Sequence, residues 1–162
     1  MDPFDKKDES KVEEIQVDEK RYLDILQTQE DKVLCIPNRI INPDDNYLMP
    51  ETYDFAKWVR RNVPEVAIAV EEGDGVKDLR SGDFWFPVIL LIGDVSLQIA
   101  VNIVSNYIYD KIKGKLQHDP VSVHLETIFQ DKGKKEIKKF SYNGSLEGLE
   151  KIKSNIDKFL EG

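Results

Sequence analysis

The chain has 162 residues, which is enough for one domain with a buried core, and hydrophobic residues make up 40% of it, which excludes disorder over the whole length. Its formal net charge of −8 argues against a nucleic-acid binder, because such proteins displace the counterions of the phosphate backbone with a basic surface. A single cysteine excludes an intrachain disulfide.

The N-terminal segment is dense in Asp, Glu and Lys and contains few apolar side chains. This composition predicts a flexible charged tail over residues 1–20, followed by one domain over residues 21–162. The chain does not open with the apolar stretch of a signal peptide. We therefore expect a cytoplasmic protein, unless the apolar run described below inserts into a membrane.

The first elements of the predicted domain are short. Apolar spacing over residues 21–27 indicates a short helix, and "KVLCI" at 32–36 predicts a buried strand that stops at Pro37. Cys35 lies within this strand, and we interpret it as a buried, inert thiol rather than a nucleophile. The acidic loop "NPDDN" at 42–46 lacks the ligand spacing and the distal Glu of a calcium loop, so we interpret it as solvated.

A helix, a strand and a glycine turn follow. Pro50 suits the first position of a helix that continues through residues 51–62 and ends at Pro64. "EVAIAVEE" at 65–72 predicts a short strand, and "GDG" at 73–75 predicts a turn. The side chains that we expect to face inward from the helix are Tyr53 or Phe55, Trp58 and Val59.

Residues 84–112 are nearly free of charge, and two interpretations compete for them. The favoured one is a buried strand, "WFPVILLI", followed by a long central helix over 95–116, because Gly93 and Asp94 divide the run as a turn and a helix N-cap. Asp94 at mid-membrane would also cost about 2.5–3.5 kcal/mol. The predicted helix has an apolar face and one polar stripe, formed by Gln98, Asn102, Ser105, Tyr109 and Lys113.

The alternative is membrane association through residues 84–112. The run is long enough to span a bilayer, and Lys111, Lys113 and Lys115 would provide a cytoplasmic flank. Both interpretations stay open at this point.

The C-terminal part predicts a β-hairpin and a final helix. Residues 121–129 alternate with period two, with Val121, Val123, Leu125 and Phe129 on one face and Ser122, His124 and Glu126 on the other. Gly133 predicts a hairpin turn at 131–134, and "EIKKFSY" returns as the second strand. A helix over 145–160 follows, with Ser145 as its N-cap. Its apolar face comprises Leu149, Ile152, Ile156 and Phe159 or Leu160.

The sequence offers few groups for chemistry, and we assign no catalytic, cofactor-binding or metal-ligating residue and expect no cofactor. It has no phosphate loop, dinucleotide glycine pattern, zinc-ligand spacing or serine elbow. His118 and His124 are interpreted as surface or edge histidines. A metal-dependent hydrolase or nuclease would need converging acids near the apolar run, for which the candidates are Asp78, Asp83 and Asp94, with Arg80. We expect Trp58, Phe84 and Trp85 to pack in the core rather than to line a ligand pocket.

The stretches "FWFPVILLIGDVSLQIAVNIVSNYIYDK" and "VSVHLETIFQDKGKKEIKKFSYNGSLEGLEKIK" carry a resemblance. In their order of apolar helix, Gly-turn hairpin and final helix, residues 84–160 resemble the effector-associated constant components, small accessory proteins of bacterial conflict and defence gene clusters. The helix of this chain departs from the Gly- and Ala-rich family pattern. The resemblance implies a non-enzymatic adaptor that acts beside a separate effector, and it transfers no functional residue.

The fold expected from these patterns is α+β or α/β in a single domain. Its small mixed sheet would include a C-terminal hairpin packed on the long central helix and on a C-terminal helix. The expected function is a non-enzymatic interaction or adaptor module of a bacterial cytoplasmic system, and the resemblance implies a system of defence. It would bind a protein partner or a second copy of itself, and no nucleic acid. The alternatives are the metal-dependent hydrolase and the membrane-associated protein.

Overall fold

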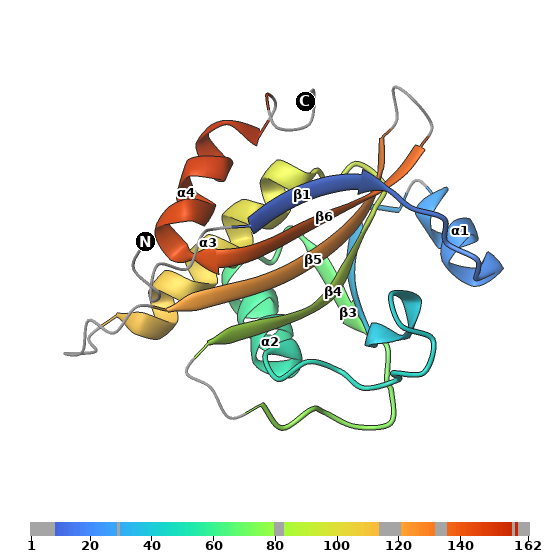
Figure 1. The fold of residues 1–162 in the computed structure, drawn as a ribbon, viewed down its shortest axis with the longest axis horizontal. Coiled ribbons are helices and arrows are strands. Elements are labelled where there is room, and N and C mark those ends of the chain that lie inside the picture. Colours follow the sequence, from blue (N-terminus) through green and yellow to red (C-terminus); the bar gives the residue numbers. More distant parts are fainter. Residues whose placement is uncertain are drawn as a thin grey trace, which may run out of the picture.

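The computed structural model describes residues 9–28, 30–79, 83–113, 121–131, 136–156 and 158. Its centre is a six-stranded mixed sheet with strand order β1-β6-β5-β4-β2-β3 (Figure 1). The strands are β1 (Glu9–Glu14), β2 (Lys32–Ile36), β3 (Ala67–Val70), β4 (Phe84–Ile92), β5 (Ser122–Asp131) and β6 (Glu136–Ser145). The helices are α1 (Lys20–Leu26), α2 (Thr52–Asn62), α3 (Leu97–Ile112) and α4 (Leu146–Ser154), with a 3-10 turn η1 (Asn38–Ile40). This confirms an α+β domain with a mixed sheet.

Both parallel and antiparallel pairs occur in the sheet. β4 pairs with β5, and β2 with β3, in parallel, whereas β1–β6, β5–β6 and β2–β4 are antiparallel. Helix α3 lies in the connection between β4 and β5, because parallel neighbours need a crossover. β5 and β6 form the predicted hairpin, whose turn at 132–135 lies outside the described residues.

β4 is buried on both faces of the sheet, which explains why its sequence is continuously apolar instead of alternating. Ile89 and Leu91 join a core with residues of α2, α3 and α4. Val88, Leu90 and Ile92 point to the other face and pack with Tyr22 and Leu26 of α1. The two clusters lie on opposite sides of one strand, so β4 is the centre of the hydrophobic core.

The apolar run at 84–112 is therefore divided between a central strand and a helix, as the favoured interpretation predicted. Within the described residues, no helix combines the length and the apolarity needed to cross a bilayer. The predicted helices at 21–27 and 50–62 and the strands at 32–36 and 65–72 also correspond to observed elements, with shorter bounds at several ends. The helix predicted at 145–160 corresponds to α4, and part of its predicted end lies outside the described residues.

The N-terminal segment differs from the expected tail over residues 1–20. Glu9–Glu14 forms strand β1 along β6, Val17 is buried, and α1 begins at Lys20. A charged strand is stable here because its backbone hydrogen bonds go to β6 while its charged side chains stay at the surface. Residues 1–8 lie outside the described residues.

The start of α3 also differs from the prediction. Ser96, not Asp94, is the N-cap, and its hydroxyl oxygen accepts a bond from the Ile99 N–H at 3.2 Å. Asp94 instead lies in the turn after β4, where its own N–H donates to Asp31 Oδ1 at 2.7 Å. The predicted polar stripe is interrupted as well, since Ser105 is fully buried, whereas Ile99 is 39% exposed.

We therefore expect Ser96→Ala to lower the free energy of unfolding by about 1 kcal/mol, because it removes the capping oxygen. Ser96→Thr, which keeps a capping hydroxyl at the same position, should cost less. Urea denaturation of both variants checks this order. If Ser96→Thr were as destabilised as Ser96→Ala, the hydroxyl of residue 96 would not be what stabilises the helix start.

The predicted cap of α4 is confirmed. The hydroxyl oxygen of Ser145 accepts a hydrogen bond from the Gly148 N–H at 3.0 Å. Leu149 and Ile156 are buried as expected, and Ile152 packs against them. Phe159 and Leu160 lie outside the described residues.

Candidate functional site

Strands β1, β6 and β5 expose one face on the side opposite α3, and we call it the open sheet face. Alternation sends Leu125, Phe140 and Tyr142 into the core, so their strand neighbours point the other way. The register places these neighbours opposite one another in pairs. The open sheet face comprises Lys11, Glu13, His124, Glu126, Lys139, Ser141 and Asn143.

His124 is the centre of this face, and both of its ring nitrogens have partners. Nδ1 lies 2.7 Å from Asn143 Oδ1, and Nε2 lies 3.3 Å from Asp83 Oδ2. The indole ring of Trp85 stacks on the imidazole, with 3.6 Å between ring centroids and 11° between planes. The histidine is thus fixed in position from three sides while part of its side chain stays exposed.

Local backbone structure explains why Trp85 reaches this face. β4 pairs Trp85 with His124, and the register then shifts between Trp85 and Val88, which is an irregularity of the β-bulge type. Pro87 lies within the shift and has no N–H for the ladder. Phe84 and Phe86 enter the core, so Trp85 lies on the opposite face of the strand. The expectation of a core position is correct for Phe84 and wrong for Trp85.

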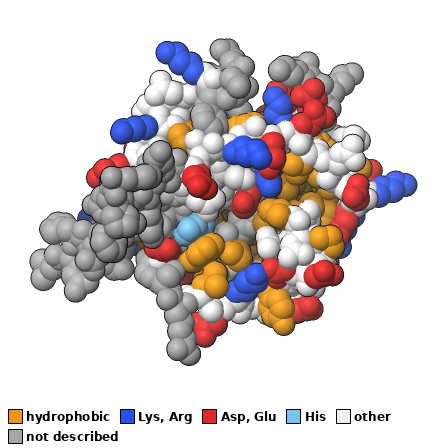
Figure 2. Space-filling view, in the orientation of Figure 1, with side chains coloured by type: hydrophobic (Ala, Val, Ile, Leu, Met, Phe, Trp, Pro, Cys, Tyr) orange, Lys and Arg blue, Asp and Glu red, His pale blue; other side chains and the backbone are white. Residues whose placement is uncertain are grey.

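A second group of polar side chains continues the face two residues further along each strand, or about 7 Å away. The Ser141 hydroxyl donates to Glu126 at 2.6 Å, and Lys139 Nζ lies 3.1 Å from Glu13 and 3.9 Å from Glu126. Hydrogen bonds from Lys11 and Lys139 lower the pKa of the Glu13 carboxyl. Figure 2 shows acidic and basic side chains interspersed over this side, with the histidine surface beside hydrophobic side chains.

Of the acids proposed for metal-dependent chemistry, Asp83 and Asp94 do not converge. Asp83 and Asp94 flank opposite ends of β4, roughly 35 Å apart along an extended strand. Within the part of the chain that the structure describes, no three His, Cys, Asp or Glu side chains are arranged to hold a metal ion. Arg80 and His118 lie outside that part.

The sequence did not reveal the contact between His124 and Asp83. The two residues are 41 positions apart, and they meet because β4 and β5 are parallel neighbours. The period-two pattern did place His124 on the polar side of its strand. Which strand lies next to β5 depends on tertiary packing, so the partners of His124 could be found only in the structure.

A separate polar cluster joins α1 to the end of β3. The Tyr22 hydroxyl donates to Glu71 at 2.7 Å, and Arg21 contacts the same carboxylate at 2.8 Å. Arg39 also pairs with Glu71 and donates to the Tyr22 oxygen at 2.7 Å. Burial, with the hydrogen bond to Glu71, raises the pKa of Tyr22 well above its usual range. Because Glu71 satisfies three neighbours at once, we interpret this cluster as a structural connection.

The remaining sequence candidates have structural roles. Cys35 is fully buried, and burial raises the pKa of its thiol to about 12, which agrees with an inert cysteine. In the 42–46 loop, Asp45 pairs with Lys77 and accepts a bond from Asn38 at 2.9 Å, and these contacts lower its pKa, the bond from Lys77 most of all. The Trp58 indole N–H donates to Asp110 at 2.8 Å across α2 and α3.

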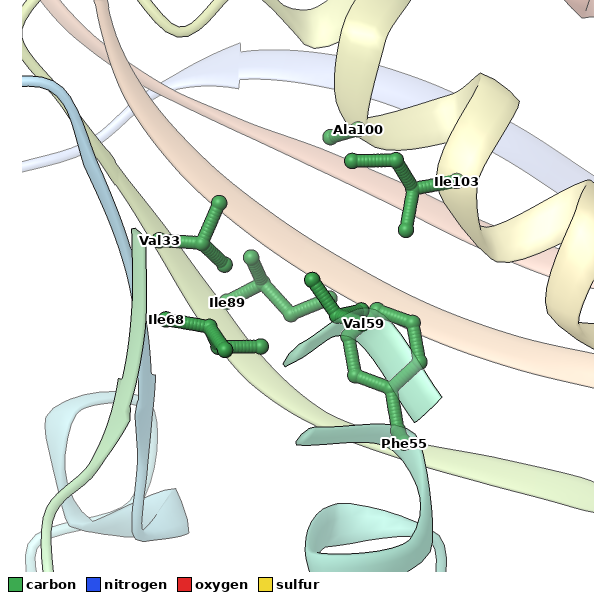
Figure 3. A pocket seen from close by; sticks show the side chains of 7 residues that line it. All are labelled: Val33, Phe55, Val59, Ile68, Ile89, Ala100 and Ile103. Carbon is green, nitrogen blue, oxygen red and sulfur yellow. The ribbon is translucent and has the colours of Figure 1, made fainter. Parts of the chain in front are cut away.

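An internal cavity lies between α2, α3 and the sheet (Figure 3). Its volume is about 10 Å³, close to the minimum for one water molecule, and an apolar lining offers such a molecule no hydrogen bonds. We therefore interpret it as a packing gap. It is lined by Val33, Phe55, Val59, Ile68, Ile89, Ala100 and Ile103.

Comparison with known proteins gives no relative: no family model, no curated protein and no solved structure matches this chain.

Proposed function

We propose that this protein is a non-enzymatic interaction module that binds a partner protein on the open sheet face, around Trp85 and His124. The observation that carries the proposal is the fixed geometry of this pair. The stacked rings are oriented by Asp83 and Asn143, on the two nitrogens of the imidazole. A surface that is already ordered loses little conformational entropy when a partner binds.

The chemistry of the face also suits recognition. Tryptophan supplies a large share of binding energy at many protein interfaces, particularly when polar groups surround it. Here the stacked pair is followed along the strands by Glu126, Ser141 and Lys139, which offer acceptors, a hydroxyl and a cation. A partner that covers the rings and matches these alternating charges would gain both affinity and a defined orientation.

The wider setting of the proposal comes from the resemblance of residues 84–160 to accessory components of bacterial conflict systems. In this setting the C-terminal hairpin, packed on α3 and α4, is the rigid framework, and the opposite side of the hairpin carries the binding surface. The partner would be a separate effector protein in the bacterial cytoplasm.

One observation favours a second candidate, an enzyme with His124 as a general acid or base. Its Nε2 lies 3.3 Å from the Asp83 carboxylate, and such a carboxylate orients the imidazole in many hydrolases. However, the other nitrogen contacts Asn143 at 2.7 Å. A proton transfer to substrate would have to break one of the two contacts, so we prefer the binding function.

Affinity capture with the tagged full-length protein in its native host tests the proposal, followed by reconstitution of the complex from purified components. We expect Trp85→Leu and His124→Ala to weaken binding of the purified partner about tenfold or more. Trp58→Leu is the matched control, because Trp58 is also partly exposed but lies on α2, and it should bind as the parent does.

If both variants on the open sheet face bind the partner with parental affinity, the face is not the binding surface. If His124→Ala abolishes turnover of a substrate while binding is unchanged, the acid–base candidate replaces the interaction module. Thermal melting of each variant confirms that the fold is retained.

A further inference from the structure

Strand β1 forms one border of the sheet (Figure 1). It pairs with β6 through Glu9–Glu14, opposite residues 138–143. Four of its six residues are exposed, and the other two are half-buried. A border strand has backbone N–H and C=O groups directed away from the sheet, and another strand can pair with them.

The hydrogen-bond pattern shows which groups these are. The Ile15 N–H donates to the Ile137 carbonyl at 3.0 Å, directly after β1. In an antiparallel pair, bonded positions alternate, so Glu13 and Lys11 also direct their backbone groups toward β6. The backbone groups of Ser10, Val12 and Glu14 therefore point to the outer side, where a further strand would find them.

We propose that β1 is a self-association strand: two copies of this chain pair antiparallel through it, with Val12 opposite Val12 of the second copy. In this register Ser10 lies opposite Glu14, so all three outward-facing residues exchange backbone hydrogen bonds. Lys11 then lies opposite Glu13 in the non-bonded positions, where side chains approach most closely. The symmetry repeats each of these pairs, giving two Lys–Glu contacts across the interface.

The charges of Lys11 and Glu13 favour this register over the two registers that are shifted from it by two residues. A shift by two residues keeps the outward-facing groups paired but places Lys11 opposite Lys11 in one direction, or Glu13 opposite Glu13 in the other. Like charges directly opposite one another destabilise a strand pair, whereas opposite charges stabilise it. Charged residues at a sheet border usually prevent pairing, but here they allow one alignment and disfavour the two adjacent ones.

The consequence is a surface that extends across both copies. The side chains of Lys11 and Glu13 lie on the open sheet face, because their strand partners Ser141 and Lys139 do. Pairing through β1 would align the two open sheet faces in one continuous sheet. This inference rests on the register of β1 and not on the proposed function, so either can fail without the other.

Sedimentation equilibrium of the full chain tests the proposal. We expect a dimer that dissociates on dilution, and we expect Lys11→Glu to raise its dissociation constant about tenfold or more, because it opposes Glu13 of the second copy with a like charge. Lys57→Glu is the matched control. It makes the same change in net charge on the exposed side of α2, away from β1, and should shift the constant less than about twofold.

A charge swap gives the sharpest readout. Glu13→Lys alone should weaken the dimer, and the double variant Lys11→Glu/Glu13→Lys should regain most of the affinity, since the pairing becomes Glu opposite Lys. Melting curves monitor the contact of residue 13 with Lys139 within each chain. A parent protein that stays monomeric at about millimolar concentration would overturn the proposal. So would a dimer whose dissociation constant is unaffected by Lys11→Glu and by the swap.

Discussion

Gly93→Ala is expected to lower the free energy of unfolding by about 3 kcal/mol or more, a large part of the stability of a domain of this size. Gly93 ends β4 with φ of +71°, a conformation that side chains disfavour. A Cβ placed there would lie 2.5 Å from Asp31 Oδ1 and 2.6 Å from the Glu30 carbonyl oxygen. The turn must therefore move, and the bond from the Asp94 N–H to Asp31 is disturbed with it.

A double variant separates the contributions of the two close contacts, to Asp31 Oδ1 and to the Glu30 carbonyl oxygen. Asp31→Ala removes the nearer oxygen but leaves the Glu30 carbonyl at 2.6 Å from the new Cβ. Gly93→Ala should therefore still cost about 2 kcal/mol when it is added to Asp31→Ala. Urea denaturation of the four proteins measures both values. A loss below about 1 kcal/mol in the single variant would mean that the turn between β4 and α3 rearranges easily.

The division of the 84–112 run shows what local sequence can predict. A run of apolar residues is ambiguous between a membrane helix and a buried strand, but Gly93 resolves it because a left-handed turn ends the strand. The local sequence does not determine which residue is the N-cap of the following helix, α3. Asp94 and Ser96 are both good capping residues, and the local sequence does not distinguish them. In the structure Ser96 is the cap, and the backbone N–H of Asp94 donates to Asp31, 63 positions away in the chain.

Strand β1 shows where local sequence is insufficient. Its composition is that of a solvated tail, and no isolated six-residue segment of this kind would form a strand. It is ordered because β6 offers it an edge to pair with, and β6 lies near the other end of the chain, so the pairing cannot be read from the local sequence. The candidate site also depends on strand pairing between distant parts of the chain. Trp85 and His124 were visible as residue types, but their stacking depends on the parallel pairing of β4 with β5.

The buried tyrosines and the buried thiol predict a steep loss of stability in alkali. Burial, with a hydrogen bond to Glu51, raises the pKa of Tyr107 far above its usual value of 10, and Tyr22 behaves in the same way beside Glu71. The pKa of the buried Cys35 thiol rises from 9.0 to about 12. As the pH increases, the unfolded chain therefore loses these protons first. Stability is full below about pH 9 and falls above it.

Proton linkage gives an estimate of how steeply the free energy of unfolding falls with pH. Each such group contributes about 1.4 kcal/mol per pH unit, so the loss starts with Cys35 and reaches about 4 kcal/mol per unit above pH 10, where the unfolded tyrosines also ionise. We expect unfolding in alkali before pH 12, where the folded thiol itself ionises and its contribution ends. Urea midpoints measured at intervals from pH 8 to about pH 11 give the slope directly.

Two tyrosine variants on the same helix test the assignment. Tyr107→Phe removes a buried phenol, so the slope above pH 10 should fall by about 1.4 kcal/mol per pH unit, whatever the variant costs at neutral pH. Tyr109 lies two positions further along α3 and is 48% exposed, so Tyr109→Phe should leave the slope as it is in the parent. Equal slopes in the parent and in Tyr107→Phe would mean that the Tyr107 phenol ionises in the folded protein as readily as in the unfolded chain. The contact between Tyr107 and Glu51 would then not hold its proton in alkali.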